Sequence, residues 1–433
     1  MNLLKKIENR QARVGVIGAG YVGLPLAVEF AKAGFDTTCF DVDPDRIESI
    51  NRGRSQIQDV PSADVLRLKR DGLLRATGDF EELAQIDAIS ICVPTPLRKT
   101  KDPDVSYVVA AVEEIALRFS PGKLVVLEST TYPGTTDEIL QPVLESSGLV
   151  CGKDFHLAFS PERVDPGNQQ YNTSNTPKII GGVTPRCTQV ACALYGAAVE
   201  KVIPVSSTRA AEMVKLLENT FRAVNIGLAN ETALMCDRLG IDVWEVIDAA
   251  ATKPFGFMPF YPGPGLGGHC IPIDPHYLSW KLRSLNYTAR FIELAGEVNS
   301  SMPRYVVERL ADLLNARRKP LNGSRVLVLG TSYKRDVSDT RESPALDIIK
   351  LLAQRGTLVA YHDPFVKSLD LGEVELESVR LTPQELSSAD LTLIVADHSR
   401  FNYNSIVRNS QLVLDTRNAT RNVRRGRDKI VLL

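Results

Sequence analysis

Apolar runs alternate with helical patterns in the N-terminal part of the chain. The run Val14–Ile17 predicts a strand, an apolar helical face continues to Gly34, and a second strand ends at Asp41. Three further short apolar runs each end in a polar loop, near Ile91, Val126 and Phe159. This alternation predicts a doubly wound parallel sheet whose loops gather at the carboxyl ends of its strands.

The pattern changes after Ser206. From there to about Leu239 the chain has no proline and a single glycine, Gly227, and Gly240 follows the last residue. Serine and threonine at the start can cap a first helical turn, and a glycine just past the end terminates a helix. We predict one long, mostly buried helix of some 30 residues, about 45 Å in length. We expect it to join two domains and two subunits.

A second strand–helix–strand pattern begins near Ser324, in RVLVLG, SPALDIIKLLAQRG and TLVAYHDP, and the strand LTLIVAD follows later. The polar segment LNARRKPLNGS before it contains Pro and Gly, as domain boundaries often do. The predicted fold class is therefore α/β, with two Rossmann-like domains joined by a long central helix and a helical middle domain. The predicted boundaries are 1–205, 206–315 and 316–433.

The composition and the net charge limit the kinds of partner that the protein is expected to bind. The 433 residues are 44% hydrophobic, which is enough for more than one packed core, and 51 basic residues nearly balance 52 acidic ones. A chain without a charge excess is not drawn to nucleic acid or to an anionic membrane, so local groups must hold any phosphate. No apolar stretch before the first predicted strand has the length of a signal peptide, and no window approaches the roughly 20 apolar residues of a membrane span. We expect a cytoplasmic protein.

The seven cysteines form an odd set without CxxC pairs. This argues against a disulfide framework and against a zinc site, and we expect no metal. Most of these thiols should be buried as small apolar groups.

The segment GAGYVG matches the GxGxxG fingerprint of dinucleotide-binding turns. It follows a predicted strand and opens a predicted helix, and Asp41 lies 18 residues after Gly23 at the end of the second strand. A carboxylate there can bond both ribose hydroxyls and repels a 2′-phosphate, so NAD is favoured, although Arg46 leaves NADP open. The alternative is a glycine turn without a ligand. The candidate cofactor residues are Gly18, Gly20, Tyr21, Val22, Gly23, Asp41 and Arg46.

The segment KPFGFMPFYPGPGLGGHCIPIDPHY is so rich in Pro and Gly that it must be an ordered loop. Small residues precede Cys270 in its centre, and a loop that permits close backbone approach suits a thiol that must touch a substrate carbon. The alternative is a structural cysteine in a rigid turn.

Other polar residues could assist this thiol. Lys215 and Asn219 are four residues apart on the long helix and share a face, where they could hold an oxyanion or a water. Glu162 and Thr130 follow predicted strand ends, at the ligand-binding edge of such a sheet. Asp274 follows Cys270 by four residues and could orient a base. A solvated lysine, helix caps or loop-stabilising groups are the alternatives.

Taken together, GAGYVG, SPER, EMVKLLENTFRAVNIGLANE, GPGLGGHCIPID and TSYKRDVSDTRESPA resemble the UDP-glucose/GDP-mannose dehydrogenase family, from Val14 to near Arg425. The resemblance implies NAD in the N-terminal domain, a nucleotide in the C-terminal domain and a homodimer through the central helix. It implies a nucleophilic Cys270, with Lys215, Asn219 and Asp274 supporting the oxyanion and the water. It also implies Glu162 as the base in hydrolysis and Thr130 as its partner for that water and the cofactor.

The resemblance also implies further residues of the cofactor site and the residues of the substrate site. Lys334 and Arg341 would reach the phosphates and the nicotinamide side. Further cofactor residues would be Thr95, Thr130 and Arg341. Substrate residues would be Glu162, Arg163, Lys215, Asn219, Tyr261, Gly267 and Lys334.

The implied reaction is a four-electron oxidation of a sugar C6 alcohol through a thiohemiacetal and a thioester, for surface polysaccharide synthesis. The glucose-oxidising branch carries a glutamate where this chain has Pro166. The PERVDPG and FYPGPGLGGHCIPIDP forms resemble the branch that acts on UDP-N-acetylhexosamines, so UDP-N-acetylglucosamine is the expected substrate. UDP-N-acetylmannosamine and UDP-glucose are the competing substrates. A nucleotide-sugar sensor or a two-electron hydroxyacid dehydrogenase are the competing classes. The departure of Gly330-Thr331-Ser332-Tyr333 from GxGxxG suggests that the second βαβ domain binds UDP rather than a dinucleotide.

Overall fold

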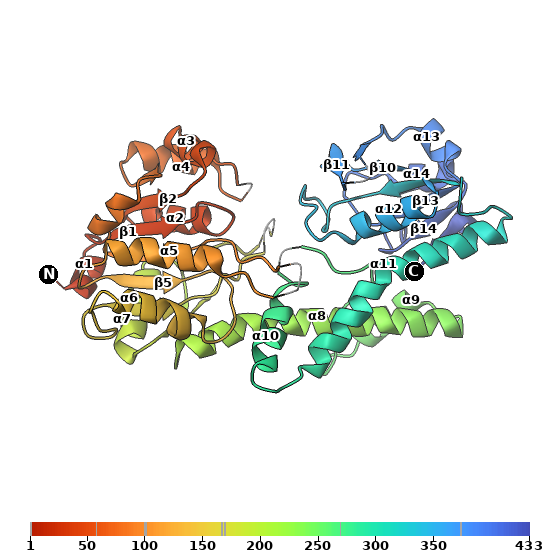
Figure 1. Ribbon diagram of the computed structural model, residues 1–433. Helices are drawn as coiled ribbons and strands as arrows, with labels where there is room; N and C mark the ends of the chain where they lie inside the picture. Colours follow the sequence, from red (N-terminus) through yellow and green to blue (C-terminus); the bar gives the residue numbers. More distant parts are fainter. Residues whose placement is uncertain are drawn as a thin grey trace. The chain divides into compact units, whose positions relative to one another are not determined.

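The computed structural model describes residues 2–57, 59–98, 102–165, 168, 170–268, 270–372 and 375–433 (Figure 1). Pro166 and His269 therefore lie outside the described residues. The chain divides into two compact units, the first formed by Met1–Glu218 with His276–Tyr287 and the second by Asn219–Pro275 with Thr288–Leu433. The three predicted domain boundaries stay predictions.

The first unit is built on a sheet of eight strands in the described part of the chain, in the order β3-β2-β1-β4-β5-β6-β7-β8. Its strands are β1 Arg13–Ile17, β2 Asp36–Phe40, β3 Leu74–Thr77, β4 Ala88–Ile91, β5 Leu124–Leu127, β6 His156–Phe159, β7 Lys178–Gly182 and β8 Val202–Val205. The order reverses between β1 and β4, which is where doubly wound sheets bind ligands. The strands predicted from the apolar runs are confirmed.

Two strands, β7 and β8, run in the opposite direction to the other six. β6 and β7 are antiparallel, with Ala158 opposite Gly182 and Phe159 opposite Gly181, whereas the other neighbours are parallel. A parallel return needs a crossover, usually a helix, and the described residues between β6 and β7 contain none. β7 therefore begins at the edge where β5 and β6 end.

Helices cover both faces of this sheet. One face packs against α1 Leu3–Glu8, α2 Gly23–Lys32, α4 Ser62–Arg70 and α7 Pro185–Tyr195. The other packs against α5 Ser106–Leu117 and α6 Gln141–Glu145, with the short helices η1 Phe80–Gln85 and η2 Thr136–Leu140. The unit also contains α3 Pro44–Asn51 and most of α10 Asp274–Arg283. The predicted doubly wound architecture is confirmed.

The predicted long helix is α8 Thr208–Leu239, 32 residues, and it ends before Gly240, whose φ is +68°. The division between the two units falls within it, after Glu218. In the second unit a Cβ on Gly227 would lie 3.2 Å from the Cα of Ala295, so this glycine lets α8 approach α11 Arg290–Ala316 closely. Among the described residues, no helix is both long and apolar enough to cross a membrane. The predicted cytoplasmic location stays a prediction.

The second unit contains a parallel sheet in the order β10-β9-β13-β14-β15. Its strands are β9 Arg325–Leu329, β10 Leu358–His362, β13 Leu391–Ile394, β14 Val413–Asp415 and β15 Ile430–Leu432, with a separate hairpin of β11 Ser368–Asp370 and β12 Glu375–Glu377. One face packs against α11 and α12 Pro344–Gln354, the other against α13 Pro383–Ser388 and α14 Tyr403–Asn409. α9 Val243–Ala251 packs beside α8. The predicted fold class is confirmed.

Candidate functional site

The three glycines of the turn after β1 have different roles: two are required by the fold and one leaves room for a ligand. Gly18 has a φ of +93°, and a Cβ there would lie 2.6 Å from the carbonyl oxygen of Cys92. A Cβ on Gly23 would lie 1.8 Å from the carbonyl oxygen of Gly18, so α2 can start only with glycine. A Cβ on Gly20 would meet no atom of the described residues within 4 Å. The turn therefore needs two glycines for its shape, and the third leaves its backbone open to a pyrophosphate.

Asp41 follows β2 beside this turn and is buried. Its Oδ2 accepts the N–H of Ala19 at 2.7 Å and its Oδ1 accepts the N–H of Asp43 at 3.0 Å. Arg46 lies 3.4 Å from Asp41 and 3.4 Å from Asp43, so its charge is shared between two carboxylates. A carboxylate in this place, with the nearby arginine already paired, fits an unphosphorylated ribose and hence NAD. Tyr21 is exposed and Val22 is partly buried at the start of α2.

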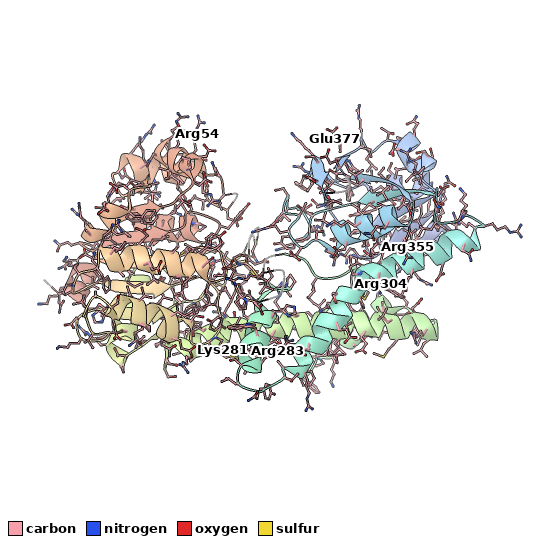
Figure 2. All side chains as sticks on the ribbon, in the orientation of Figure 1. Arg54, Lys281, Arg283, Arg304, Arg355 and Glu377 are labelled. Carbon is pink, nitrogen blue, oxygen red and sulfur yellow. The ribbon has the colours of Figure 1, made fainter. Side chains whose placement is uncertain are left out.

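The loop after β4 is tied to α10. Thr95 is buried, and its carbonyl oxygen accepts the hydroxyl proton of Tyr277. Lys281 on the same helix, labelled in Figure 2, pairs with Glu138 at 2.6 Å. The loop at the switch point of the sheet is therefore fixed by a segment that is distant in sequence.

The loop after β5 carries Thr130, which is half-buried. Glu212, a fully buried residue of α8, accepts the N–H of Gly134 at 2.6 Å, the N–H of Thr136 at 2.9 Å and the Thr136 hydroxyl at 2.7 Å. Burial raises the pKa of Glu212. The sequence analysis did not select Glu212, although a glutamate one turn before Lys215 on a buried helix was a usable signal.

Glu162 belongs to a cluster of charged side chains at the carboxyl ends of β5 and β6. Its Oε1 accepts the N–H groups of Arg163 and Val164, each at 2.7 Å, and its Oε2 lies 3.1 Å from Nζ of Lys178. Lys178 also donates to Glu128 at 2.5 Å. The sequence analysis missed Lys178 and Glu128. The signals available were a charged residue directly after the apolar run LVVL, for Glu128, and one directly before IIGGV, for Lys178.

The three charges shift one another's pKa values. Burial alone would raise the pKa of Glu162, but the charges of Lys178 and Lys215 and the backbone donor outweigh burial and lower it. Burial raises the pKa of Glu128. Burial opposes the ammonium of Lys178, but the two glutamates outweigh it and raise its pKa. Glu162 is therefore an ionised carboxylate at neutral pH.

Two other predicted residues lie near this cluster. Lys215 is buried on α8, and its charge acts on Glu162. The guanidinium of Arg163 forms a two-nitrogen ion pair with Glu218, at 2.6 and 3.3 Å, and donates to the carbonyl of Pro177 at 2.7 Å. Arg163 is thus held by protein groups, and its assignment to the substrate stays a prediction.

In the second unit the structure brings Asn219, Asp274 and Cys270 together. Nδ2 of Asn219 donates to Oδ2 of Asp274 at 2.5 Å, and both residues are buried. The N–H of Asp274 donates to the carbonyl oxygen of Cys270 at 2.8 Å, and the N–H of Ile273 donates to the same oxygen at 3.1 Å. Cys270 therefore begins the turn that leads into α10. Its side chain is exposed, whereas a structural cysteine would be buried.

The glycines before Cys270 let the loop pack closely against the segment that follows β9. A Cβ on Gly267 would lie 2.7 Å from Cβ of Tyr333, and a Cβ on Gly268 would lie 2.8 Å from its ring. The N–H of Gly268 donates to the carbonyl oxygen of Arg341 at 3.0 Å. The loop of Cys270 and the predicted substrate segment with Lys334 are thus one packed structure.

Three other predicted residues lie in the second unit. Tyr261 donates its hydroxyl to Asp248 at 2.8 Å and stacks on Trp244. The guanidinium of Arg341 pairs with Asp339 at 2.7 Å. Lys334 is half-buried. Their proposed contacts with ligands stay predictions.

The first turn of the second sheet repeats the geometry of the glycine turn after β1. The N–H of Gly330 donates to the carbonyl of His362 at 3.0 Å, and the N–H of Thr331 donates to Oδ2 of Asp363 at 2.7 Å. Here, however, Nε2 of the fully buried His398 lies 3.1 Å from the same carboxylate oxygen. A histidine occupies the position that a ribose would need, which supports the prediction of a different ligand.

A cavity of about 560 Å³ lies at the carboxyl ends of β13 and β14. Four arginines line it, Arg335, Arg400, Arg417 and Arg421. Asp397 also lines it and pairs with Arg335 at 3.4 Å. The excess of positive charge suits an anionic ligand such as a diphosphate. These arginines are separated in sequence, and no pattern identified them beforehand.

Comparison with known proteins agrees with this architecture. Residues 12–199 match the NAD binding domain of the UDP-glucose/GDP-mannose dehydrogenase family, residues 209–301 its central domain and residues 327–422 its UDP binding domain. The UDP-N-acetyl-D-glucosamine 6-dehydrogenase of Pseudomonas aeruginosa is 38% identical, over 90% of this chain and 92% of the relative. The NDP-N-acetyl-D-galactosaminuronic acid dehydrogenase of Ralstonia solanacearum is 37% identical, over 95% and 97%. The solved UDP-D-ManNAc dehydrogenase of Pyrococcus horikoshii superposes with a TM-score of 0.88 at 34% identity, covering 97% of this chain and 98% of that one.

Proposed function

The chain belongs to the UDP-glucose/GDP-mannose dehydrogenase family and is an NAD-dependent oxidoreductase, and we propose that it oxidises C6 of UDP-N-acetylglucosamine to a carboxylate. The observation that carries the chemistry is the exposed thiol of Cys270, at the start of a turn that ends at Asp274, whose buried carboxylate accepts a hydrogen bond from Asn219. The substrate rests on the 38% identical relative and on the PERVDPG form of the loop after β6. The product would serve surface polysaccharide synthesis.

The proposed reaction uses the cysteine to retain the sugar between two oxidations. The glycine turn and Asp41 would hold NAD, and one NAD would supply the hydride acceptor for each oxidation of C6. After the first, the thiolate of Cys270 adds to the aldehyde carbon and forms a thiohemiacetal, and the second leaves a thioester. Asn219 and Lys215 stabilise the oxyanion of each tetrahedral species, because amide and ammonium donors favour developing negative charge. Asp274 orients Asn219 by accepting its hydrogen bond.

Hydrolysis of the thioester needs a base for the water. Glu162 is suited to this because its carboxylate is ionised and 14% of its side chain is exposed. Thr130 is the proposed partner of that water and of the cofactor. The arginine-lined cavity beside β13 and β14 is the proposed site of the diphosphate, with Lys334 and Arg341 as further cations.

We also propose a homodimer through α8. Six large apolar residues of this helix are between 37% and 70% exposed, and they follow one another at spacings of four or seven: Met213, Leu217, Phe221, Leu228, Met235 and Leu239. Such spacings place side chains on one helical face. A continuous exposed apolar face of this kind is suited to a second copy of the same helix.

The first test is the amount of NADH formed per mole of limiting UDP-N-acetylglucosamine, with UDP-N-acetylmannosamine and UDP-glucose as parallel substrates. Two NADH per sugar are expected from the proposed substrate. One NADH would contradict the thioester route. Two NADH from a parallel substrate and none from UDP-N-acetylglucosamine would reject the proposed sugar and retain the chemistry. A Cys270→Ser variant should lose complete oxidation by about 10³-fold or more, since the covalent step is removed.

The dimer is tested by Leu228→Glu, which places a charge in the middle of the apolar face. Sedimentation velocity should show a dimer for the unchanged protein and a monomer for the variant. Leu117→Glu is the matched control, because Leu117 is 76% exposed and belongs to a different helix, α5. A Leu228→Glu protein that remains a dimer would refute the assignment.

A further inference from the structure

Glu128, Lys178 and Glu162 form a row of charges at one edge of the first sheet. Glu128 follows β5, Lys178 begins β7 and Glu162 follows β6. The exposed fractions of their side chains are 0%, 3% and 14% in that order. Only the outer member of the row is accessible to a ligand, so the two inner members can influence a reaction only through Glu162.

The reversed direction of β7 creates this row. Phe159 lies opposite Gly181, and continuing the antiparallel register outward places Glu162 opposite Lys178. A parallel β7 would place its first residue at the other edge of the sheet, remote from Glu162. Because β7 is reversed, the ammonium of Lys178 lies at the edge at which doubly wound sheets bind ligands.

The ammonium group of Lys178 has a hydrogen-bond acceptor for each of its protons. Its Nζ lies 2.5 Å from Glu128, 3.1 Å from Glu162 and 3.5 Å from the carbonyl oxygen of Pro161, so its three protons have three acceptors. The Nζ also lies 5.7 Å from the centre of the Tyr195 ring. A lysine held in this way cannot swing toward solvent, and it fixes the direction of the Glu162 carboxylate.

We propose that Lys178, itself held by Glu128, is a positioning residue that keeps Glu162 oriented and ionised for thioester hydrolysis. This rests on the proposed function. In that step the water oxygen bonds to the thioester carbon and the C–S bond breaks, with its electron pair passing to the sulfur of Cys270. The proton lost by the water passes to Glu162. The product leaves as a carboxylic acid and loses its remaining proton to solvent.

The charges around Glu162 explain why the ammonium is needed. Lys178 and Lys215 face it with positive charge, and Glu128 faces it with negative charge. Cys92 and Tyr195 border the two glutamates as neutral groups. Without Lys178, two neighbouring buried carboxylates would share one site, and like charges in such a pair raise the pKa of one member. Glu162 would also lose the charge and the hydrogen bond of Lys178, both of which lower its pKa.

The alternative is a buried ion pair that serves stability only. Removing one partner of such a pair destabilises a protein strongly, whereas replacing both with neutral groups is often tolerated. We therefore use Lys178→Met together with the double variant Glu128→Gln/Lys178→Met, in which no uncompensated inner charge remains. Lys123→Met is the matched control, because Lys123 is an equally buried lysine that precedes β5 and donates to the carbonyl of Leu83 at 2.7 Å.

The experiment follows the covalent intermediate as well as turnover. In the double variant kcat should fall by about 10- to 100-fold and KM should fall with it, so that kcat/KM changes little, because a misplaced base slows hydrolysis of the thioester and not the steps before it. An initial burst of NADH should appear, and mass spectrometry of the intact chain should find the acyl group on Cys270. The acidic limb of the kcat profile should move to higher pH. Glu162→Gln should accumulate the same adduct, and Lys123→Met should not.

Three results would overturn the proposal. The first is a folded double variant with no adduct and an unmoved acidic limb. The second is a Glu162→Gln protein that hydrolyses the thioester at the normal rate. The third is measured on the unchanged protein and so does not depend on a variant that folds. It is an apparent pKa of about 4.3, the ordinary glutamate value, or higher for the acidic limb of thioester hydrolysis. An unchanged protein that never forms an adduct and yields one NADH per sugar would instead refute the proposed function itself.

Discussion

Asn219 donates to the buried carboxylate of Asp274 at 2.5 Å, and this short contact offers a test at the scale of one residue. Replacing Asn219 with alanine removes a donor from a buried charged group, which costs on the order of 1–3 kcal/mol. We expect the free energy of unfolding in urea to fall by that amount and kcat to fall with it. Asn225→Ala is the control, because Asn225 is half-buried on the same helix and donates to the carbonyl of Phe221 at 2.7 Å within that helix, so both quantities should change far less.

Gly18 and Gly20 separate the requirements of fold and ligand within one turn. Gly18→Ala forces a side chain to 2.6 Å from a carbonyl oxygen at a φ of +93°, so it should lower the melting temperature by several degrees. Gly20→Ala meets no described atom within 4 Å and should leave the melting temperature unchanged. It should still weaken NADH binding, by roughly tenfold, because a methyl group would crowd the pyrophosphate. Equal effects of both variants on stability would contradict this division.

At the scale of elements, the turn after β9 donates to Asp363, which follows β10, and this contact predicts how the stability of the protein depends on pH. Burial alone would raise the pKa of Asp363, but hydrogen bonds from His398 and from backbone N–H groups lower it to about 2. A lowered carboxylate pKa contributes stability that is present above the unfolded value of about 3.9 and is lost as the pH falls toward 2. Asp363→Asn should therefore be less stable than the unchanged protein at pH 7, and the difference should shrink below pH 4.

Urea unfolding at pH 7, 5, 4 and 3 measures this difference. Asp428→Asn is the control, since Asp428 is exposed and should give a small difference at every pH. A difference for Asp363→Asn that stays constant from pH 7 to pH 3 would show that its hydrogen bonds do not depend on the charge.

The helices and strands also show which features of the fold could be predicted from the sequence and which could not. Local signals were sufficient for the glycine turn with Asp41, for the long helix ending at Gly240, and for most strands of both sheets. The direction of β7 was not predictable, because it depends on the path of a connection and not on a periodic pattern. Glu128 and Lys178 are fifty residues apart, and their contact follows from that direction. His398 carried no signal, because its role depends on a distant aspartate.

At the scale of the whole molecule, the first unit is not continuous in sequence, since His276–Tyr287 belongs to it although Asn219–Pro275, which comes before that segment, belongs to the second unit. Trp280 of this segment packs on Tyr132, with ring centres 5.0 Å apart, and Tyr277 is fully buried. Trp280→Ala should destabilise the full chain by about 2–3 kcal/mol through lost aromatic burial. Tyr277→Phe should cost about 1 kcal/mol, since it loses one buried hydrogen bond.

Protease cleavage around residues 276–287, followed with and without NADH, measures the same contacts. Both variants should be cleaved faster there than the unchanged protein, and Trp280→Ala should be cleaved faster than Tyr277→Phe. Cleavage that is no faster than in the unchanged protein would mean that this segment contributes little to the first unit.

The return of α10 to the first sheet also has a consequence during synthesis on the ribosome. The chain emerges from its N-terminus, so the residues of α10 that fix the loop after β4 appear only after all of α8 and the cysteine loop have been made. Until then, the growing polypeptide carries a nearly finished nucleotide-binding domain with an uncovered surface. Nascent chains stalled shortly before residue 276 should therefore bind chaperones more strongly than chains stalled after residue 287.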